Sequence, residues 1–366
     1  MKWEKVSLES ISTRIGDGLH GTPKYDDSGE FYFINGNNLS EGKILIKEDT
    51  KRISSIEYDK IKKDLSEKTV LVAINGTLGN VGLYRDEPVA LGKSACYINV
   101  NDKAEKLFVR YVLENHDFQR YARDFATGST IKNLGLKAVR DYSFNLPPIP
   151  TQRKIVSILS AYDDLIENNL KRIKLLEEKG LMEYRILFKE NELKEFPIED
   201  VWEIKYGKNL PQTKISEFGK YPVYGAAGRI GFYEEFNYEF PVALVTSRGN
   251  GSGVAHRTNQ AAFVTNNSFA FVPKEDFVNV HFHLAEMILR DLELTQLRSG
   301  TAQPQLTIAG LIGVKLKLPN KEALIEYNKI VDPSFDLIHT LEKQNTKLRE
   351  ARDILLPKLM NGQIEV

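Results

Sequence analysis

The sequence predicts an α+β fold with two β-rich domains separated along the chain by long helices. The two helices pair as an antiparallel coiled coil, and the whole forms an internal pseudo-two-fold repeat. Three observations predict this. A 366-residue chain is too long for one ordinary hydrophobic core. Asp164-Leu165-Ile166 returns 172 positions later as Asp336-Leu337-Ile338. Each half of the chain also ends in a long stretch with apolar residues at helical spacing.

The repeat extends beyond that triplet. At the same offset, Gly128, Leu134, Leu146, Pro147, Leu176 and Leu187 are followed by Gly300, Leu306, Leu318, Pro319, Leu348 and Leu359. Upstream the offset is one residue longer, since Val72, Gly76 and Val81 are followed by Val245, Gly249 and Val254. Ordered matches at a nearly constant spacing indicate a duplicated structural unit.

The first part of each repeat has the pattern of β structure. Residues 69–84, "TVLVAINGTLGNVGLY", are two apolar runs around a glycine-rich turn, and residues 241–257 have the same form. Apolar residues at helical spacing predict a helix over 106–125, with a counterpart near 280–298. Each repeat therefore begins with a β-rich globule that also contains a helix.

The second part of each repeat is a long helix. Residues 155–187 contain no proline, and their apolar residues recur mostly three or four positions apart, as in a coiled-coil seam. The prolines of "NLPPIPT" and Thr151 mark its start. In the second copy, Asn345 falls on the seam, where a polar residue can fix register, and Pro333 predicts a late start or a kink. Each helix exposes one apolar stripe, so we expect the other helix to cover it.

Four segments follow: a β-rich domain over 1–150, a central helix over 151–190, a second β-rich domain over 191–320 and a distal helix over 321–366. Antiparallel helices would place the β-rich domains at opposite ends of the pair, and parallel helices would place them together. The duplication makes one chain imitate a symmetric dimer. Duplex DNA has local two-fold symmetry that dimeric readers match. Two unlike globules would then recognise two unlike half-sites.

Composition limits the partners and the compartment. Lysine plus arginine and aspartate plus glutamate both number 50, which argues against a large nonspecific nucleic-acid coat but not against a locally shaped DNA-binding face. The single cysteine, Cys96, excludes an internal disulfide and fits a reducing cytoplasm. No secretory signal pattern or membrane-spanning apolar run is present, so we expect a cytoplasmic protein without membrane contact.

Several segments resemble the specificity (S) subunit of type I restriction-modification systems. "LPPIPTQRKIVSILSAYDDLIENNLKRIKLLE" looks like the central conserved helix of that family, and "LREARDILLPKLMNGQIEV" looks like its distal conserved end. "YPVYGAAGRIGFYEE" and "LVTSRGNGSGVAH" look like one target recognition domain, and "LVAINGTLGNVGLY" and "ATGSTIKNL" look like pieces of the other. The resemblance covers essentially the whole chain.

The resemblance implies separate roles for the globules, the helices and the partner subunits. Each globule would be a target recognition domain for one half of a bipartite DNA site, and the helices would set the gap and dock two methyltransferase subunits. Those partners would carry S-adenosylmethionine and methylate adenine, and restriction-translocase subunits would add ATP and magnesium chemistry. This chain would hold no cofactor and catalyse nothing. One departure is that "LPNKEALIEYNKIVDPSFDLI" lacks the glutamine of "PPIPTQRKIVSILSAYDDLI", so the two docking faces need not be equivalent.

Three local patterns imitate catalytic or metal-binding motifs. "LGKS", residues 91–94, lacks the earlier glycine of a phosphate-binding loop, because position 87 is Glu. "GNGSG", residues 249–253, misses the dinucleotide spacing and is a strand-connecting turn, which could also face DNA. His281 and His283 form an HxH pair, but zinc needs more ligands, so ordinary core or surface histidines are the favoured interpretation and no metal is expected.

Candidate DNA contacts are polar residues in the glycine-rich and asparagine-rich segments, since such side chains bind base edges and phosphates. In the first β-rich domain they are Lys24, Tyr25, Asn35, Asn37, Asn38, Thr77, Lys93, Ser94, Ser129 and Lys132. In the second they are Arg229, Ser247, Arg248, Asn250, His256, Arg257, Asn266, Asn267, Thr301, Gln303 and Gln305. We expect about a third of the set to contact DNA.

Two rival functions use the same sequence differently. An enzyme acting alone would need a catalytic constellation, which the sequence does not show. A non-enzymatic coiled-coil scaffold that binds protein or carbohydrate explains the duplication equally well, but it predicts binding without the steep salt dependence of DNA contacts.

Overall fold

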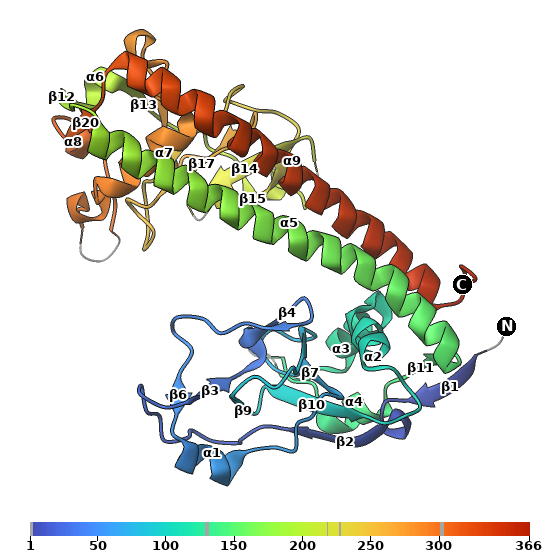
Figure 1. Cartoon of the computed structure of the whole chain (residues 1–366). Helices are drawn as coiled ribbons and strands as arrows, with labels where there is room; N and C mark the ends of the chain where they lie inside the picture. The colour runs from blue at the N-terminus through green and yellow to red at the C-terminus, as the bar shows by residue number, and fades with distance from the viewer. Residues whose placement is uncertain (1–2, 129–131, 218, 227, 301–303) are drawn as a thin grey trace. The chain divides into compact units, whose positions relative to one another are not determined.

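The computed structural model describes residues 3–128, 132–217, 219–226, 228–300 and 304–366. They form two compact units (Figure 1). Unit 1 is Met1–Glu167 together with Thr346–Val366, and unit 2 is Asn168–Asn345. The two longest helices, α5 (Ile149–Glu190) and α9 (Lys321–Met360), contribute to both units. Across the described ranges, no helix is long and apolar enough to cross a membrane.

Unit 1 is built on a four-stranded antiparallel sheet. Its strands lie in the order β2 (Ser12–Asp17), β10 (Ala95–Val100), β7 (Thr69–Ala73) and β8 (Val81–Leu83). Side chains alternate between the two faces of a strand, and both faces of β7 are buried. Val70 and Val72 face a core that includes Ile155 and Leu159 of α5, while Leu71 packs on the other side.

A smaller sheet covers that other side. It has the order β6 (Arg52–Ile53), β3 (Phe31–Ile34) and β9 (Val89–Leu91), with β3 and β9 parallel. Two short pairs complete the strands: β1 (Glu4–Ser7) with β11 (Ser143–Leu146), and β4 (Leu39–Ser40) with β5 (Lys43–Ile44). The shorter helices are α1 (Ser55–Ile61), α2 (Lys106–Glu114), α3 (His116–Phe125) and α4 (Leu136–Asp141).

Unit 2 repeats this plan, except that its described strands include no counterpart of the β4–β5 pair. Its large sheet has the order β13 (Trp202–Tyr206), β19 (Ser268–Pro273), β16 (Ala243–Thr246) and β17 (Ala255–Arg257). Its smaller sheet is β15 (Gly228–Tyr233), β14 (Tyr221–Gly225) and β18 (Phe263–Val264), again with one parallel pair, and β12 (Lys194–Pro197) pairs with β20 (Lys315–Leu318). Its short helices are α6 (Ile198–Val201), α7 (Phe282–Asp291) and α8 (Ile308–Leu311).

Within each unit, a stretch of α5 lies antiparallel to a stretch of α9. In unit 1, Asp163 of α5 contacts Arg352 of α9, and Leu159 shares a core with Leu356. In unit 2, Asn169 bonds to Asn345 (Nδ2 to Oδ1, 2.9 Å). The antiparallel pairing and the duplicated α+β fold expected from the sequence are thus confirmed. The buried Asn169–Asn345 pair fits the predicted register-fixing role of a polar residue in a helical seam.

Two local expectations need correction. The helix predicted over 106–125 is divided between α2 and α3, because Asn115 has an extended backbone (ψ 143°). The late start predicted from Pro333 is wrong. The helix begins at Lys321, where the Asn320 side chain accepts a hydrogen bond from the Ala323 N–H (2.8 Å). This bond caps the helix twelve positions before the proline, so the start is set by Asn320 rather than by Pro333.

Candidate nucleic-acid interface

In unit 1, four loops are bonded together beyond the ends of the buried strands. The Ile74 N–H donates to the Ser94 carbonyl (2.9 Å), and the Leu134 N–H donates to the Ile74 carbonyl (2.8 Å). The Gly36 N–H donates to Ser94 Oγ (2.9 Å). We call residues 35–38, 74–80, 92–94, 127–128 and 132–134 the first loop cluster. Its segments come from distant parts of the sequence, but hydrogen bonds from the backbone and from the Ser94 side chain fix their relative positions.

Unit 2 contains an equivalent set. The Ser247 N–H donates to the Asn267 carbonyl, and the Leu306 N–H donates to the Ser247 carbonyl, both at 2.8 Å. Ser268 Oγ donates to the Gly225 carbonyl (3.1 Å). The second loop cluster is residues 225–226, 228–229, 247–254, 265–268, 299–300 and 304–306. The bonds at 74, 94 and 134 recur at 247, 267 and 306, so the sequence repeat is also a repeat of hydrogen bonding.

The clusters share a backbone design but present different side chains. In the first, Asn37, Thr77, Lys93 and Lys132 are exposed. In the second, Arg229, Arg248, Asn250, Asn267 and Gln305 are exposed. These side chains include the amide and guanidinium groups that bind base edges in the major groove. The two clusters share one backbone arrangement but present different hydrogen-bond donors and acceptors. Each can therefore recognise a different base sequence.

Some predicted residues hold the clusters together instead of facing outward. Asn38 is 4% exposed, and its Nδ2 donates to the Leu45 carbonyl (2.9 Å). Asn35 Oδ1 accepts from Ser94 Oγ (2.9 Å). Ser247 is 1% exposed, and its hydroxyl donates to the Asn266 carbonyl (3.4 Å). Because these polar groups are bonded internally, we assign them to loop architecture.

His256 and Arg257 also turn inward. The guanidinium of Arg257 binds the buried carboxylate of Glu286, bonds to Asn259 Oδ1 (3.2 Å) and contacts Glu177 of α5 (3.4 Å). The ring of His256 lies 6.5 Å from that of Tyr224, and burial lowers its pKa. Arg257 therefore ties the large sheet of unit 2 to α5 and α7, while His256 packs toward the smaller sheet.

The remaining predictions divide into three groups. Lys24 and Tyr25 lie on a separate exposed segment, where the Tyr25 ring meets the edge of Phe33 at 6.1 Å. Asn266 is half-buried in the second cluster, where its N–H donates to the Lys208 carbonyl (3.1 Å). Ser129, Thr301 and Gln303 lie outside the described residues.

Sequence reasoning missed Asn75 and Asn133. They form a β-bridge in the first cluster, with Asn75 Nδ2 3.5 Å from Asn133 Oδ1. They correspond to Arg248 and Gln305, which form the same bridge in the second cluster. Applying the offsets of 173 and 172 to Arg248 and Gln305 finds both residues in the sequence alone.

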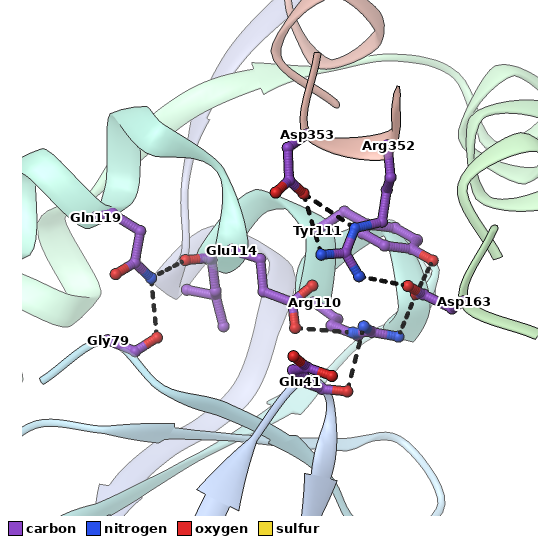
Figure 2. Close-up of polar contacts among 10 residues, drawn as sticks. Glu41, Gly79, Arg110, Tyr111, Glu114, Gln119, Asp163, Arg352 and Asp353 are labelled. Carbon is purple, nitrogen blue, oxygen red and sulfur yellow. Dashed lines mark hydrogen bonds and ion pairs between the residues drawn. The ribbon is translucent and has the colours of Figure 1, made fainter. Parts of the chain in front are cut away.

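The β-rich part of unit 1 is fixed to its helices by a network around Asp163 of α5 (Figure 2). Its carboxylate accepts from Arg110 Nη1 (2.9 Å), Tyr111 Oη (2.8 Å) and Arg352 Nη1 (2.7 Å). Arg110 also pairs with Glu114 (3.0 Å), whose pKa is raised by burial. Residues from α2, α5 and α9 therefore meet at one carboxylate, which holds the first loop cluster's scaffold to the helical pair of that unit.

Comparison with known proteins agrees with this architecture. The sequence model described as "Type I restriction modification DNA specificity domain" matches residues 1–178 and again residues 190–350. The MjaIX specificity subunit of a Methanocaldococcus jannaschii type I restriction enzyme is 24% identical, over 94% of this chain and 86% of its own. The MjaVIII specificity subunit of the same organism is 23% identical, over 82% and 80%.

A solved structure has the same fold. The crystal structure of a type I restriction-modification S subunit from M. genitalium aligns with a TM-score of 0.61 and 22% identity, covering 98% of this chain and 96% of that one. The fold and the two clusters define a protein with two copies of one recognition module. The chain belongs to the family of type I restriction-modification DNA specificity domains, which it carries twice. Its part in such a system is DNA specificity, not catalysis.

Proposed function

We propose that each loop cluster reads one half of a bipartite, asymmetric DNA target. Residues 1–150 and 191–320 would be the two target recognition domains, and residues 151–190 and 321–366 the helices that set the unread gap. The observation that carries the proposal is the equivalence of the clusters: the same backbone arrangement presents Asn75 and Thr77 in unit 1 but Arg248 and Asn250 in unit 2. One design with two surfaces suits two unlike half-sites.

The contacts divide by chemistry. Arg248 and Gln305 can each bind a base edge with two hydrogen bonds, as arginine does to guanine and glutamine to adenine. Lys93 and Lys132 are long single-point cations that suit phosphates. Because the net charge of the chain is zero, binding depends on these local groups rather than on an overall positive field.

The helices supply the surface for the partner subunits. Large apolar side chains stay exposed along them, including Leu165 (53%), Leu175 (64%), Met182 (62%) and Ile354 (58%). Apolar side chains that stay exposed at helical spacing, as Leu175 and Met182 do, form the kind of patch that marks a protein-binding surface. They would dock two methyltransferase subunits, and restriction-translocase subunits would join through the complex. S-adenosylmethionine, ATP and magnesium would belong to those partners, and the complex would act on DNA in the cytoplasm.

The test is DNA affinity of the complex assembled with its methyltransferase subunits, measured over a range of salt concentrations. Replacing Lys93 and Arg248 together with Ala should weaken binding to the target at least tenfold and flatten the salt slope by about 0.9 for each phosphate that the variant no longer neutralises. The control is Lys317→Ala in β20, which should change neither. A scaffold for protein or carbohydrate would show no salt-dependent DNA binding, and unchanged affinity in the double variant would contradict the assignment of the clusters.

A further inference from the structure

Unit 2 contains a cluster of potential metal ligands that DNA recognition does not use. His281 and His283 at the start of α7 and Asp332 of α9 each point one ligand atom at the same place, with all three atoms within 4.8 Å of one another. His281 Nδ1 lies 3.1 Å, and His283 Nε2 2.8 Å, from Asp332 Oδ1. The sequence offered only the two histidines, and the fold supplies the third ligand from about fifty residues downstream.

The local backbone explains why two histidines so close in sequence converge. His281 precedes the first turn of α7 and has an extended backbone (φ −62°, ψ 157°), while His283 is already helical. This change of conformation lets both rings face α9. The His283 ring is fully buried and stacks on Phe335, with centroids 4.3 Å apart and planes 1° from parallel. Its orientation is therefore fixed before any ligand arrives, as a binding site requires.

We propose that His281, His283 and Asp332 bind a divalent first-row transition metal, with Zn²⁺ as the best-suited ion. Imidazole nitrogen and carboxylate oxygen are both zinc ligands at about 2.0–2.2 Å, which places neighbouring ligand atoms roughly 3.3 Å apart in a tetrahedron. The two N–O separations of 2.8 and 3.1 Å need only small movements to reach that spacing. Water would complete the coordination.

The chemistry of the cluster also suits a cation. Metals bind deprotonated ligands, so each ring would coordinate through a nitrogen that carries no proton, and Asp332 would offer its carboxylate oxygen. The contacts that both rings make with Asp332 Oδ1 would then be replaced by bonds to the metal, with the ring protons on the other two nitrogens. The nearby cation, Arg257, stacks 5.0 Å from the Phe335 centroid, but its charge is offset by Glu286 and Glu177.

The site is open to solvent, and its surrounding contacts indicate how tightly it would bind a metal. The side chains of His281 and Asp332 remain 35% and 38% exposed, so an ion can reach them from solvent. Among the described residues, His283 Nδ1 has no hydrogen-bond partner. Since partners of this kind strengthen metal sites 10–100-fold, we expect binding about that much weaker than in a fully supported zinc site. A bound ion would clamp α7 to α9 beside Pro333, which cannot donate a backbone hydrogen bond.

The inference is tested on the full-length chain after removal of metals with EDTA and without DNA, so its outcome does not depend on the proposed function. Zn²⁺ uptake is measured by isothermal titration and by metal content after gel filtration. The parent protein should retain about one Zn²⁺ per chain. His281→Ala and Asp332→Ala, which replace partly exposed side chains, should each weaken binding at least tenfold. The controls His116→Ala and Asp353→Ala, a histidine and an aspartate on the surface of unit 1, should bind like the parent.

Hydrogen exchange locates the ion without any variant. Zn²⁺ should slow amide exchange in residues 281–291 and 328–339 of the parent protein and leave β7 and β10 unchanged. Co²⁺ should give the visible absorption of a tetrahedral site with nitrogen and oxygen ligands. A parent protein that retains no Zn²⁺, or one whose uptake persists in the His281→Ala/Asp332→Ala double variant, would overturn the proposal.

Discussion

The main sheets of units 1 and 2 have equivalent strand orders, and the same bonds join their loops, but different polar groups connect each globule to α5 and α9. Unit 1 uses Asp163, which binds two arginines and a tyrosine. Unit 2 uses Arg257 with Glu286, and His283 with Asp332. The position equivalent to Asp163 is Phe335, a buried aromatic residue. The backbone pattern and the apolar positions therefore define the module, while the polar attachments can be replaced as whole sets.

The largest expected difference comes from removing the centre of the unit 1 network. Asp163→Ala leaves Arg110, which is 6% exposed, with a buried charge that Glu114 alone cannot balance. Breaking a buried pair in this way costs about 3–5 kcal/mol, so the free energy of unfolding of unit 1 should fall by that amount in urea denaturation. Asp353→Ala is the matched control, since its carboxylate is 62% exposed and contacts only the rim of the network. It should cost less than about 1 kcal/mol. If Asp163→Ala and Asp353→Ala lowered the free energy of unfolding equally, Asp163 would not be the centre of a buried network.

The starts of the two long helices can be compared by giving each the residue that the other has at the equivalent position. Gln152 is fully buried, and its side chain bonds to the Glu105 N–H (2.8 Å) and to the carbonyls of Pro147 (2.8 Å) and Lys103 (3.2 Å). Its counterpart is the buried Leu324. Gln152→Leu should destabilise unit 1 by about 2–4 kcal/mol because buried backbone groups lose their partners.

The reverse change, Leu324→Gln, should destabilise unit 2 by about 1–3 kcal/mol, because it buries an amide without prepared partners. Amide hydrogen exchange followed during thermal unfolding measures the stability of each unit separately. If either substitution were neutral, the two helix starts would be interchangeable, and the sequence difference between them would have no structural meaning.

The loop clusters should respond separately to mutation. Arg248→Ala should cost about 1–3 kcal/mol of binding and relax discrimination in one half-site only. Lys93→Ala should weaken binding to all sequences by a similar factor and reduce the salt slope by about 0.9. The measurement is the affinity of the assembled complex for a set of targets with single substitutions in either half. Loss of discrimination in both halves after Arg248→Ala would contradict separate readers.

Acid should affect unit 2 more than unit 1. Burial lowers the pKa of His256, which Glu286 and Arg290 face with opposite effects, and that of His339, which faces Lys343 and Asp336. In the folded state both imidazole rings favour the neutral form. The stability that they contribute is therefore present above the unfolded pKa of about 6.5 and is lost as pH falls.

In unit 1, burial raises the pKa of Glu114, so protonation of that carboxyl favours the folded state as pH falls. Between about pH 7 and 5, amide exchange corrected for its intrinsic pH dependence should therefore accelerate more in unit 2 than in unit 1. Faster opening of unit 1 over this range would contradict the assignment of these pKa shifts.

Much of the fold follows from local sequence patterns. The burial of both faces of β7 is visible in the nearly continuous apolar run of "TVLVA", and the long helix is visible in its apolar spacing. The repeat offset even locates the paired loops. The side-chain partners were not predictable, because Asp332 reaches His283 across 49 positions and Arg352 reaches Asp163 across 189. The inward orientation of Asn38 was also missed, because it depends on how the chain folds back to bring the Leu45 carbonyl to its side chain.

The central claim is that the two loop clusters read two halves of one split DNA target. It is tested most directly by mapping adenine methylation across three genomes. These belong to a strain that carries this chain with the proposed methyltransferase partner, to the same strain without this chain, and to one that carries Arg248→Ala. We predict that one split motif is methylated in the first strain, disappears in the second and loses specificity in only one half in the third. An unchanged methylation pattern on deletion of the chain would contradict the account.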